Sequence, residues 1–334
     1  MIKIGLITPD ETDALAFYRS TGPLTHLIRN HPEFEYQFIA GTVSWATLRK
    51  FDLIFIQRPW LAEHVQICEL ANKWSVPIIA DFDDWLLDLP VSNPAYDAFN
   101  RNKKNITHIL NLVDSIIVAT DKLKTLTQSV LLDQKKPIHV IPNAYDKDLF
   151  KKYRHDGNIK PRNKYFAWRG GNSHMQDLMS VKQDYLNLFD SFPDWDFIFI
   201  AQHPWFFESK AKNVKTADPL KIIEYFRALH DTAPSIVAHP LFDCDFNRAK
   251  SMCSWLEATH ARAAFIGPDF EEFQRDGVTR YTNNFFEVAA DLLSNPEKIV
   301  SQYEASERYI QKYLSLDVVN LNRVEAFKQL PQTR

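Results

Sequence analysis

The chain has little glycine and little cysteine. Of its 334 residues, 8 are glycine and 3 are cysteine. Cys68, Cys244 and Cys253 are not clustered, so the sequence contains neither a disulfide framework nor the paired spacing of a zinc site. This cysteine usage predicts a reducing, cytoplasmic compartment. With so few glycines, a glycine pair in this sequence is more informative than usual.

Long apolar runs and a strong net charge are also lacking. No apolar stretch approaches the roughly 20 residues that a membrane span needs, and the N-terminus enters a strand pattern without a signal peptide. A net charge of −3 gives no overall argument for nucleic acid. The charge is uneven, however, because residues 101–164 hold 14 Lys and Arg against 6 Asp. Such a segment is either a binding face for a polyanion or a solvated lysine-rich surface.

The first half alternates short apolar runs with amphipathic patterns. The runs predict strands at 2–8, 35–39, 52–57, 76–80, 115–119 and 138–141. Apolar strands separated by helices indicate a parallel sheet that is covered on both faces. Residues 144–163 are polar and basic, and they read as a linker between domains.

The same alternation then starts again. We expect strands at 165–168, 196–201, 235–238 and 263–266, and helices at 174–189, 220–229, 248–260 and 285–293. Residues 296–330 form a helical tail. Two such βα units predict an α/β fold of two doubly wound, Rossmann-like domains that face a cleft, with ligands outside the carboxyl ends of the strands.

The glycine pair lies in the stretch FAWRGGNSHMQDL, between a predicted strand and a helical pattern. Gly170 and Gly171 let the backbone turn its amides toward a bound group, Arg169 adds a full positive charge, and Ser173 and His174 stand at the helix start. This pattern is typical of a site for an anion such as a diphosphate. Its alternative is an ordinary Gly-Gly turn.

An acidic cluster, DFDD, follows a buried strand. Asp81, Asp83 and Asp84 therefore lie at a carboxyl edge, where α/β sites form. They could bind a hard cation, act as a phosphoaspartyl nucleophile as in haloacid-dehalogenase phosphatases, or bond substrate hydroxyls and serve as a base. The structural alternative is a helix N-cap before Trp85.

A second cluster spans 239–267. Asp243, Asp245 and Asn247 occupy its loop, and Lys250 and Ser251 near a helix start can meet a phosphate. Glu257 lies about two turns further, where a carboxylate can accept both hydroxyls of a ribose.

Two arginines, Arg19 and Arg58, follow the first and third strand regions. Each lies at the expected cleft, where its planar guanidinium can bind an anion or an acceptor group, or form a salt bridge between domains.

In this order, the motifs resemble glycosyltransferases of the GT-B fold, near the retaining family 4. The resemblance covers about residues 1–295 and rests on FYR, DFDD, SIIVATDKL, IHVIPNAYD, WRGGNSHMQDL and PLFDCDFNRAKSMCSWLEATHARAAFIG. It implies an acceptor-side domain over 1–160, a nucleotide-sugar domain over 161–305, and a tail over 306–334 that crosses back to the first domain.

The resemblance also implies roles for residues. Arg169, Gly170, Gly171, Ser173 and His174 approach the donor diphosphate. Lys250 and Ser251 assist the phosphates, and Glu257 holds the ribose. Where the family usually has another glutamate, this chain has Ala249, and Asp243, Asp245 or Asn247 can replace it.

The implied reaction moves a sugar from a nucleoside diphosphate, with UDP as the family's usual carrier. No metal or other cofactor is expected, because GT-B enzymes generally stabilise the leaving group with cations and amides. Asp83 or Asp84 would then orient or deprotonate the acceptor hydroxyl.

The acceptor stays open at this point. The WRGG pattern is similar to that of bacteriophage proteins of this fold, some of which glycosylate hydroxymethylated bases in DNA, and a chain of that kind would work in the host cytoplasm. A saccharide or lipid-linked acceptor is the alternative. Two further hypotheses are a non-catalytic sugar-nucleotide binder and a phosphatase that uses Asp81 and Asp83. The sequence carries no signal of oligomeric state.

Overall fold

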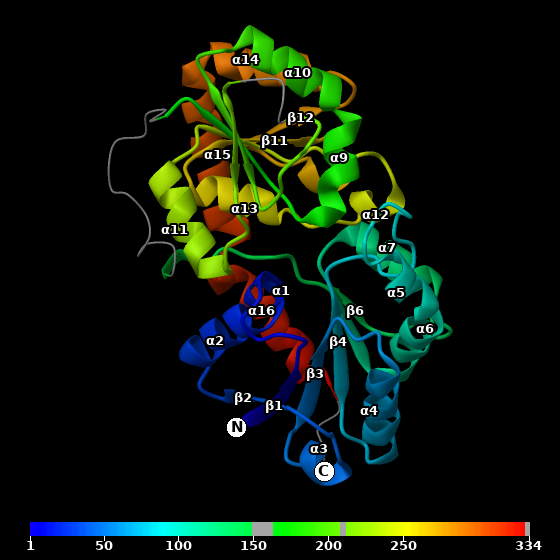
Figure 1. The fold of residues 1–334 in the computed structure, drawn as a ribbon. Helices are drawn as coiled ribbons and strands as arrows, with labels where there is room; N and C mark the ends of the chain where they lie inside the picture. The colour runs from blue at the N-terminus through cyan, green and yellow to red at the C-terminus, as the bar shows by residue number, and fades with distance from the viewer. Residues whose placement is uncertain (149–162, 208–211, 331–334) are drawn as a thin grey trace.

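Two six-stranded sheets, each with all strands parallel, form the centres of two domains (Figure 1). The computed structural model describes residues 1–148, 163–207 and 212–330. The N-terminal sheet has the order β2-β1-β3-β4-β5-β6, and the C-terminal sheet has the order β12-β11-β10-β7-β8-β9. The N-terminal strands are β1 (Ile2–Ile7), β2 (Phe34–Phe38), β3 (Leu53–Gln57), β4 (Ile78–Phe82), β5 (Ser115–Val118) and β6 (Ile138–Val140). The C-terminal strands are β7 (Tyr165–Arg169), β8 (Asp196–Ile200), β9 (Val214–Ala217), β10 (Ile236–Ala238), β11 (Ala264–Pro268) and β12 (Val278–Tyr281). This is the predicted arrangement of two doubly wound units.

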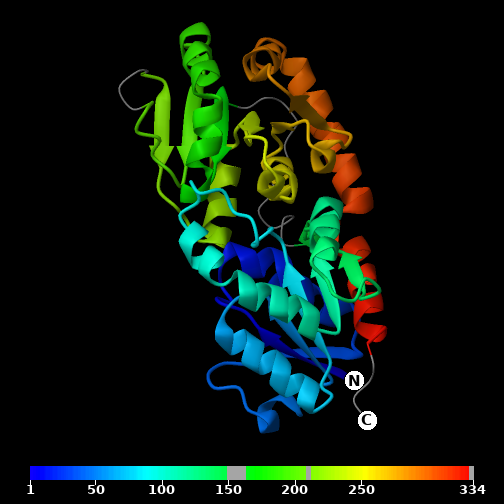
Figure 2. The same cartoon turned by 90° about the vertical axis from the view of Figure 1, so that its right-hand side faces the viewer.

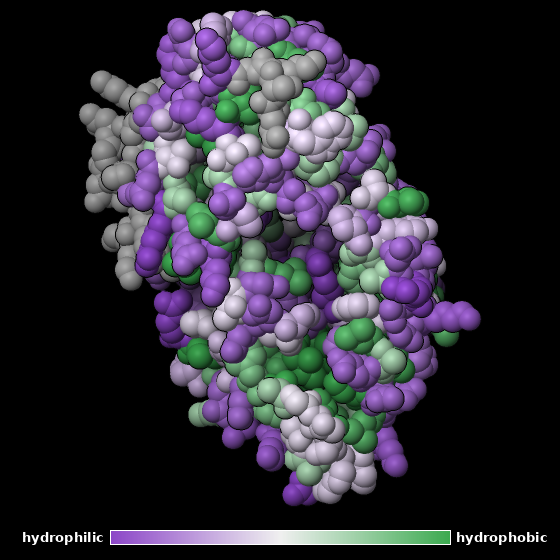
Figure 3. Space-filling view, in the orientation of Figure 1, coloured by the Kyte–Doolittle hydropathy of each residue, from purple (hydrophilic) through white to green (hydrophobic). Residues whose placement is uncertain are grey.

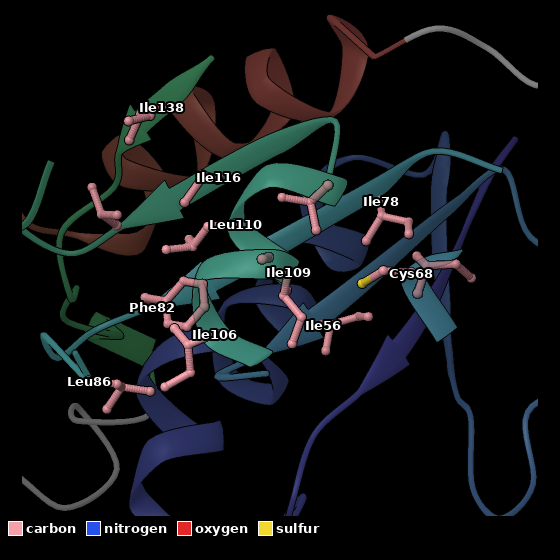
Figure 4. Close-up of a cluster of buried hydrophobic side chains, with 14 of the residues drawn as sticks. Ile56, Cys68, Ile78, Phe82, Leu86, Ile106, Ile109, Leu110, Ile116 and Ile138 are labelled. Carbon is pink, nitrogen blue, oxygen red and sulfur yellow. The ribbon is translucent and has the colours of Figure 1, made fainter. Parts of the chain in front are cut away.

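Helices cover both faces of the N-terminal sheet. They are α1 (Ala14–Arg19), α2 (Thr21–Asn30), α3 (Trp45–Leu48), α4 (Ala62–Lys73), α5 (Tyr96–Arg101), α6 (Lys103–Leu112) and α7 (Asp121–Ser129). Successive residues of a strand point to opposite faces. Ile54 and Ile56 accordingly pack against the face that α4 and α6 cover, whereas Phe55 packs against the face of α2. Figure 4 shows the first of these clusters, with Cys68 of α4 and Ile109 of α6 over the sheet.

The C-terminal domain has an aromatic core on one face of its sheet. Phe166 and Trp168 of β7, Phe197 and Phe199 of β8, and Tyr185 of a helix are fully buried there. The helices of this domain are α9 (Met175–Ser180), α10 (Lys182–Ser191), α11 (Ile222–Thr232), α12 (Asp245–Arg248), α13 (Cys253–His260), α14 (Phe285–Ser294) and α15 (Pro296–Tyr313), with short 3-10 turns η1 (Asn172–His174) and η2 (Glu271–Phe273).

The elements expected from the sequence differ from the structure at two helices and two strands. The helix expected over 174–189 is divided into η1, α9 and α10, and the helix expected over 248–260 is divided into α12 and α13. Strands β9 and β12 were not predicted. Both are edge strands with partly exposed side chains, so they lack the continuous apolar run that marks a buried strand.

The chain returns to the N-terminal domain at its end. Helix α15 belongs to the C-terminal domain, and α16 (Leu316–Lys328) packs against α2 and buries Leu316, Val319 and Phe327 in the N-terminal core. Figure 2 shows these two helices descending one side of the molecule. The proposed tail boundary at 306 falls inside α15, so the crossing lies further on, beside the bridge between Tyr145 and Ser315. Most of the expected linker, and the boundary at 160, lie outside the described residues. None of the described helices has the length and apolar character that crossing a membrane requires.

The two domains meet at their carboxyl edges. Thr120, after β5, donates its hydroxyl to the carbonyl of Ala249 (2.9 Å), and Phe246 and Ala249 pack into the N-terminal hydrophobic cluster. Figure 3 shows a hollow between the domains, with strongly hydrophilic surface at its edge. In each sheet the order in which successive strands are added reverses at one point, between β1 and β3 and between β7 and β10. Open α/β sheets bind ligands at the carboxyl edge beside such switch points.

Candidate functional site

The glycine turn follows β7 at the interdomain edge. A Cβ at Gly170 would lie 2.6 Å from the Trp168 ring, so only glycine fits there, whereas nothing lies within 4 Å of the Cβ position at Gly171. Beyond the turn stand Ser173 and His174 in η1, followed by the six-residue α9. The long helix expected here is absent, so its dipole supplies less positive charge than the sequence suggested. Side chains must supply the rest.

Glu257 of α13 is buried with its carboxylate in the gap between the domains. Its Oε1 accepts from the hydroxyl of Tyr18 (3.1 Å), and its Oε2 accepts from the hydroxyl of Tyr225 (3.0 Å). Arg169 lies 3.4 Å from the same carboxylate and stacks over the Tyr225 ring at 5.0 Å. Glu257 raises the pKa of Arg169, so this arginine is always charged. Since Tyr18 belongs to α1, this cluster joins the two domains.

The acidic motif forms a second cluster with Arg58 and Lys250. The Arg58 guanidinium donates to Oδ1 of Asp83 (2.7 Å) and to Oδ2 of Asp84 (2.6 Å). Arg58 has a left-handed φ of 47°, which is uncommon outside glycine and concentrates at functional sites. From the other domain, the Lys250 ammonium lies 3.6 Å from Oδ1 of Asp84.

The two carboxyl groups of this cluster differ in acidity. Burial raises the pKa of Asp83 against the opposing effect of Arg58. Burial acts in the same direction on Asp84, but Lys250 and Arg58 outweigh it and hold the pKa of Asp84 at about 2. Neighbouring carboxyl groups with pKa values pushed apart can take different roles, one as a base and one as a fixed charge.

Two histidines stand beside these carboxylates. His174 Nδ1 lies 2.8 Å from Oδ2 of Asp177, and its ring lies 5.1 Å from that of His239. Burial, with Lys250 nearby, lowers the pKa of His174 to about 3, so it is neutral at physiological pH. His239 is buried, and its Nδ1 has no hydrogen-bond partner among the described residues. Its pKa is lowered well below the usual value, mainly by burial.

Asp177 is held by groups of α12 and of the loop before it. Its Oδ1 accepts from the side-chain amide of Asn247 (2.8 Å) and from the backbone N–H of Phe242 (3.1 Å). Burial nevertheless raises the pKa of Asp177 to about 6. Asn247 is therefore a buried residue that holds Asp177, the partner of His174, and its side-chain amide is already hydrogen-bonded within the protein.

The remaining predicted residues lie in different surroundings. Arg19 and Asp81 form a fully buried two-oxygen ion pair (2.9 and 2.7 Å), and Arg19 also donates to the Ile141 carbonyl and to Asn143. Their positions are structural and do not face the gap. Ser251 accepts from Asn143 (2.7 Å) across the domain boundary.

Asp243 is exposed and forms an ion pair with Arg248 (2.6 Å). It lines a separate cavity of about 430 Å³ at the ends of β10, β11 and β12, together with Asp184 and Asp269. The described residues contain no group of three or more potential metal ligands.

The structure thus brings together Arg58, Asp83, Asp84, Lys250, His174, Arg169 and Glu257. The sequence analysis missed Tyr18, Tyr225 and Asp177, which hold these groups in place. Tyr18 stands next to Arg19, but nothing in the sequence shows that the two side chains face opposite ways.

Solved structures provide the comparison, since no protein-family model and no curated protein matches the chain. An alpha-glucosyltransferase in complex with UDP-glucose and DNA containing an abasic site has a TM-score of 0.69 at 11% identity and covers 98% of this chain and 99% of its own. Sucrose-phosphate synthase from Thermosynechococcus elongatus has a TM-score of 0.68 at 10% identity, with coverage of 98% and 99%. The chain has the GT-B fold.

This likeness also extends to TarM, with a TM-score of 0.63 at 12% identity over 83% of this chain and 55% of that one. At such identities the likeness concerns the fold, and the chemistry must come from the residues. In this GT-B chain, the cationic and glycine-turn groups of the C-terminal domain face the Asp83–Arg58–Asp84 cluster of the N-terminal domain.

Proposed function

We propose that this GT-B chain is a glycosyltransferase that moves a sugar from a UDP-sugar to a hydroxyl acceptor. The observation that carries the proposal is the contact of Lys250 with Asp84, because it joins two different half-sites across the gap. The C-terminal half-site offers cations and open backbone at Gly171, and the N-terminal half-site offers carboxylates. Solved structures of this fold include complexes with UDP-glucose and with UDP.

The donor would bind in the C-terminal half-site. The turn at Gly170 and Gly171, with Ser173 and His174, would face the diphosphate, while Arg169, Lys250 and Ser251 would meet its oxygens. His174 is neutral and its Nδ1–H donates to the Asp177 carboxylate, so its Nε2 is an acceptor and the ring adds neither charge nor a donor to this half-site. Glu257 would exchange its tyrosine partners for the hydroxyls of the ribose, which are donors of the same kind.

In the reaction, the bond between the sugar's anomeric carbon and the diphosphate oxygen breaks, and a bond to the acceptor oxygen forms. The negative charge that develops on UDP is stabilised by the Arg169 guanidinium and the Lys250 ammonium, which are already in place. Asp83 is the better base of the pair because its pKa is raised, and Asp84 stays ionised as a fixed charge between Arg58 and Lys250. The acceptor proton passes to Asp83.

Two of the alternative functions can be compared with this geometry. A phosphatase would need Asp81 or Asp83 as nucleophile, but Arg19 occupies both oxygens of Asp81 inside the protein. A non-catalytic binder stays open, because a binding site and an active site can share these contacts. The three free thiols, none of them in a disulfide, fit the cytoplasmic compartment that we propose.

Calorimetric titration with UDP tests the donor half of the proposal. We expect Glu257→Gln to weaken UDP binding by at least about tenfold, because a buried hydrogen bond to a charged group is lost. Glu224→Gln is the matched control, since Glu224 is exposed on α11 one residue before Tyr225. Absence of UDP binding by the unmodified chain would refute the proposal. Binding of a UDP-sugar with neither hydrolysis nor transfer would establish the non-catalytic alternative.

A further inference from the structure

A large groove opens at the switch point of the N-terminal sheet. It has a volume of about 990 Å³ and lies where β1, β2 and β3 end, between the loop 39–43 and the first turns of α4. The sheet order reverses there, since the chain goes from β1 to β2 on one side and continues with β3 on the other. Ligands of open α/β sheets bind in such a crevice. Nothing in the donor site described above uses it.

The walls of this groove are mainly apolar. Ile39, Val43, Trp60, Leu61 and Leu70 line it, and its polar side chains are threonine hydroxyls, one amide, a histidine and one carboxylate. The histidine, His64, is occupied, because its Nδ1 accepts the backbone N–H groups of Trp60 and Leu61. Figure 3 shows apolar surface over the part of the N-terminal domain that lies beside α4 and in front of β3.

The charge around the groove is negative. Glu63 is the only charged residue that lines it. Asp10 and Glu11 follow directly after Pro9 at its rim, and both are exposed. None of the lysines and arginines in the described part of the chain lines it, so these residues offer no counter-charge to a phosphate backbone.

Several lysines of the basic segment are used elsewhere. Lys136 donates to three backbone carbonyls at the end of α6, and Lys122 pairs with Asp245 (2.8 Å). Lys147 pairs with Asp317. These contacts account for part of the positive charge of the segment without a polyanion.

The groove lies next to the segment that carries Arg58 of the reaction site. Trp60 stands two residues after Arg58, whose guanidinium binds Asp83 and Asp84, and its ring packs against Phe99 at 4.9 Å. Thr8 in the groove wall donates to Gln57, the residue before Arg58. A molecule seated in the groove therefore extends toward the proposed base.

We infer that this groove binds the acceptor, and that the acceptor is an uncharged molecule whose hydroxyl is attached to an apolar body, such as a hydrophobic alcohol or glycoside. The inference rests on the proposed function and names its acceptor class. DNA with a hydroxymethylated base, the acceptor suggested by several complexes of this fold, does not match the apolar walls and acidic rim.

Acceptor competition tests the inference. With a UDP-sugar as donor, we expect kcat/KM for octyl glucoside, below its micelle-forming concentration, to exceed that for methyl glucoside by at least about tenfold, since each buried methylene adds to binding. Phenyl glucoside shows whether an aromatic body serves as well as an aliphatic one. Duplex DNA with 5-hydroxymethylcytosine should be a poor acceptor at every salt concentration.

Variants locate the effect. Trp60→Ala should remove most of the preference for octyl over methyl glucoside, and Trp74→Ala, at the other end of α4, should leave it unchanged. Calorimetric titration of octyl glucoside without donor gives a second readout. If Trp60→Ala does not fold, Leu70→Gln replaces it, and it should likewise reduce the preference for octyl over methyl glucoside.

The outcomes separate the two proposals. Equal rates for octyl and methyl glucoside, or efficient transfer to DNA, would overturn the acceptor class while leaving sugar transfer intact. If the unmodified chain does not bind UDP, the proposed function itself is refuted. If neither Trp60→Ala nor Leu70→Gln changes the affinity for octyl glucoside, the groove is not the acceptor-binding site.

Discussion

Two arginine–carboxylate pairs stand at the same edge of the N-terminal sheet, and they differ in their access to water. Arg19 and Asp81 are 0% exposed, whereas the side chains of Arg58 and Asp83 are 21% and 15% exposed. Asp81 and Asp83 are only two residues apart. One of these pairs stabilises the fold, and the other stands where a substrate can reach it.

The surroundings of the buried pair make it costly to break. Arg323 of α16 is also fully buried nearby, and its Nε and Nη2 have no hydrogen-bond partners among the described residues. Burial and the charge of Arg19 lower the pKa of Arg323 to about 9, while Asp81 acts in the opposite direction. Asp81 is therefore a single carboxylate beside two buried guanidinium groups.

The largest effect should come from Asp81→Asn. It leaves Arg19 and Arg323 buried without a carboxylate, which should lower the free energy of unfolding by about 3–5 kcal/mol. The urea midpoint measures this. Asp88→Asn, at an exposed position of the loop after β4, is the control and should change little. A loss below about 1 kcal/mol would mean that the pair is not the structural one.

The partly exposed pair, Arg58 and Asp83, should respond differently. Its substitution should lower the rate of sugar transfer and leave the stability nearly unchanged. We expect Asp83→Asn to slow sugar transfer by about a hundredfold or more, because the proton acceptor is lost. Its urea midpoint and UDP affinity should stay close to those of the unmodified chain. A variant that transfers sugar at the original rate would exclude Asp83 as the base.

A pH experiment extends the comparison to the C-terminal domain. Glu272 is buried and has only a 3.4 Å contact with Arg275, and burial raises its pKa to about 7. The folded state therefore keeps a proton that the unfolded state loses, so the stabilising contribution is full below about pH 4.5 and is lost as the pH rises through 7.

The shift corresponds to at most about 3 kcal/mol. Relative to the unmodified chain, Glu272→Gln should gain stability between pH 5 and pH 8 by roughly 2 kcal/mol. Chemical denaturation across this range is the measurement. Glu271→Gln, at the exposed neighbouring residue, is the matched control.

The smallest effect concerns an exposed pair between the domains. Lys122 and Asp245 are 31% and 53% exposed, so Lys122→Ala should change the free energy of unfolding by only about 0.5 kcal/mol or less. Lys124→Ala, two residues further along α7 and exposed, is the matched control. A change above 1 kcal/mol would show that this contact is more than a surface pair.

The sequence predicted the interior strands well because their apolar runs are continuous. The run at 52–57 became β3, and the run at 115–119 became β5, each within a residue of its predicted bounds. The two edge strands of the C-terminal sheet, β9 and β12, lack such runs and were missed, whereas the edge strands β2 and β6 of the N-terminal sheet were predicted. The helix from 174 is divided at Val181, whose backbone (φ −118°, ψ 22°) leaves the helical region, and hydrophobic periodicity does not encode such a break.

The site was predictable only as a list of residues. The sequence placed Asp81, Asp83 and Asp84 at one strand end, but not their burial, which depends on Arg19 from 62 residues away. In the same way, Glu257 was named without its partner Tyr18, which lies 239 residues away in the chain. Contacts of this separation come from tertiary packing, so the structure alone assigns them.

The last helix has a consequence for how the protein is made. The hydrophobic core of the N-terminal domain includes Leu316, Val319 and Phe327 of α16, and the Asn320 amide bonds the Pro23 carbonyl (3.0 Å). A ribosome synthesises these residues after those of the C-terminal domain. The first domain thus waits, incomplete and with apolar surface uncovered, until translation has passed through the second.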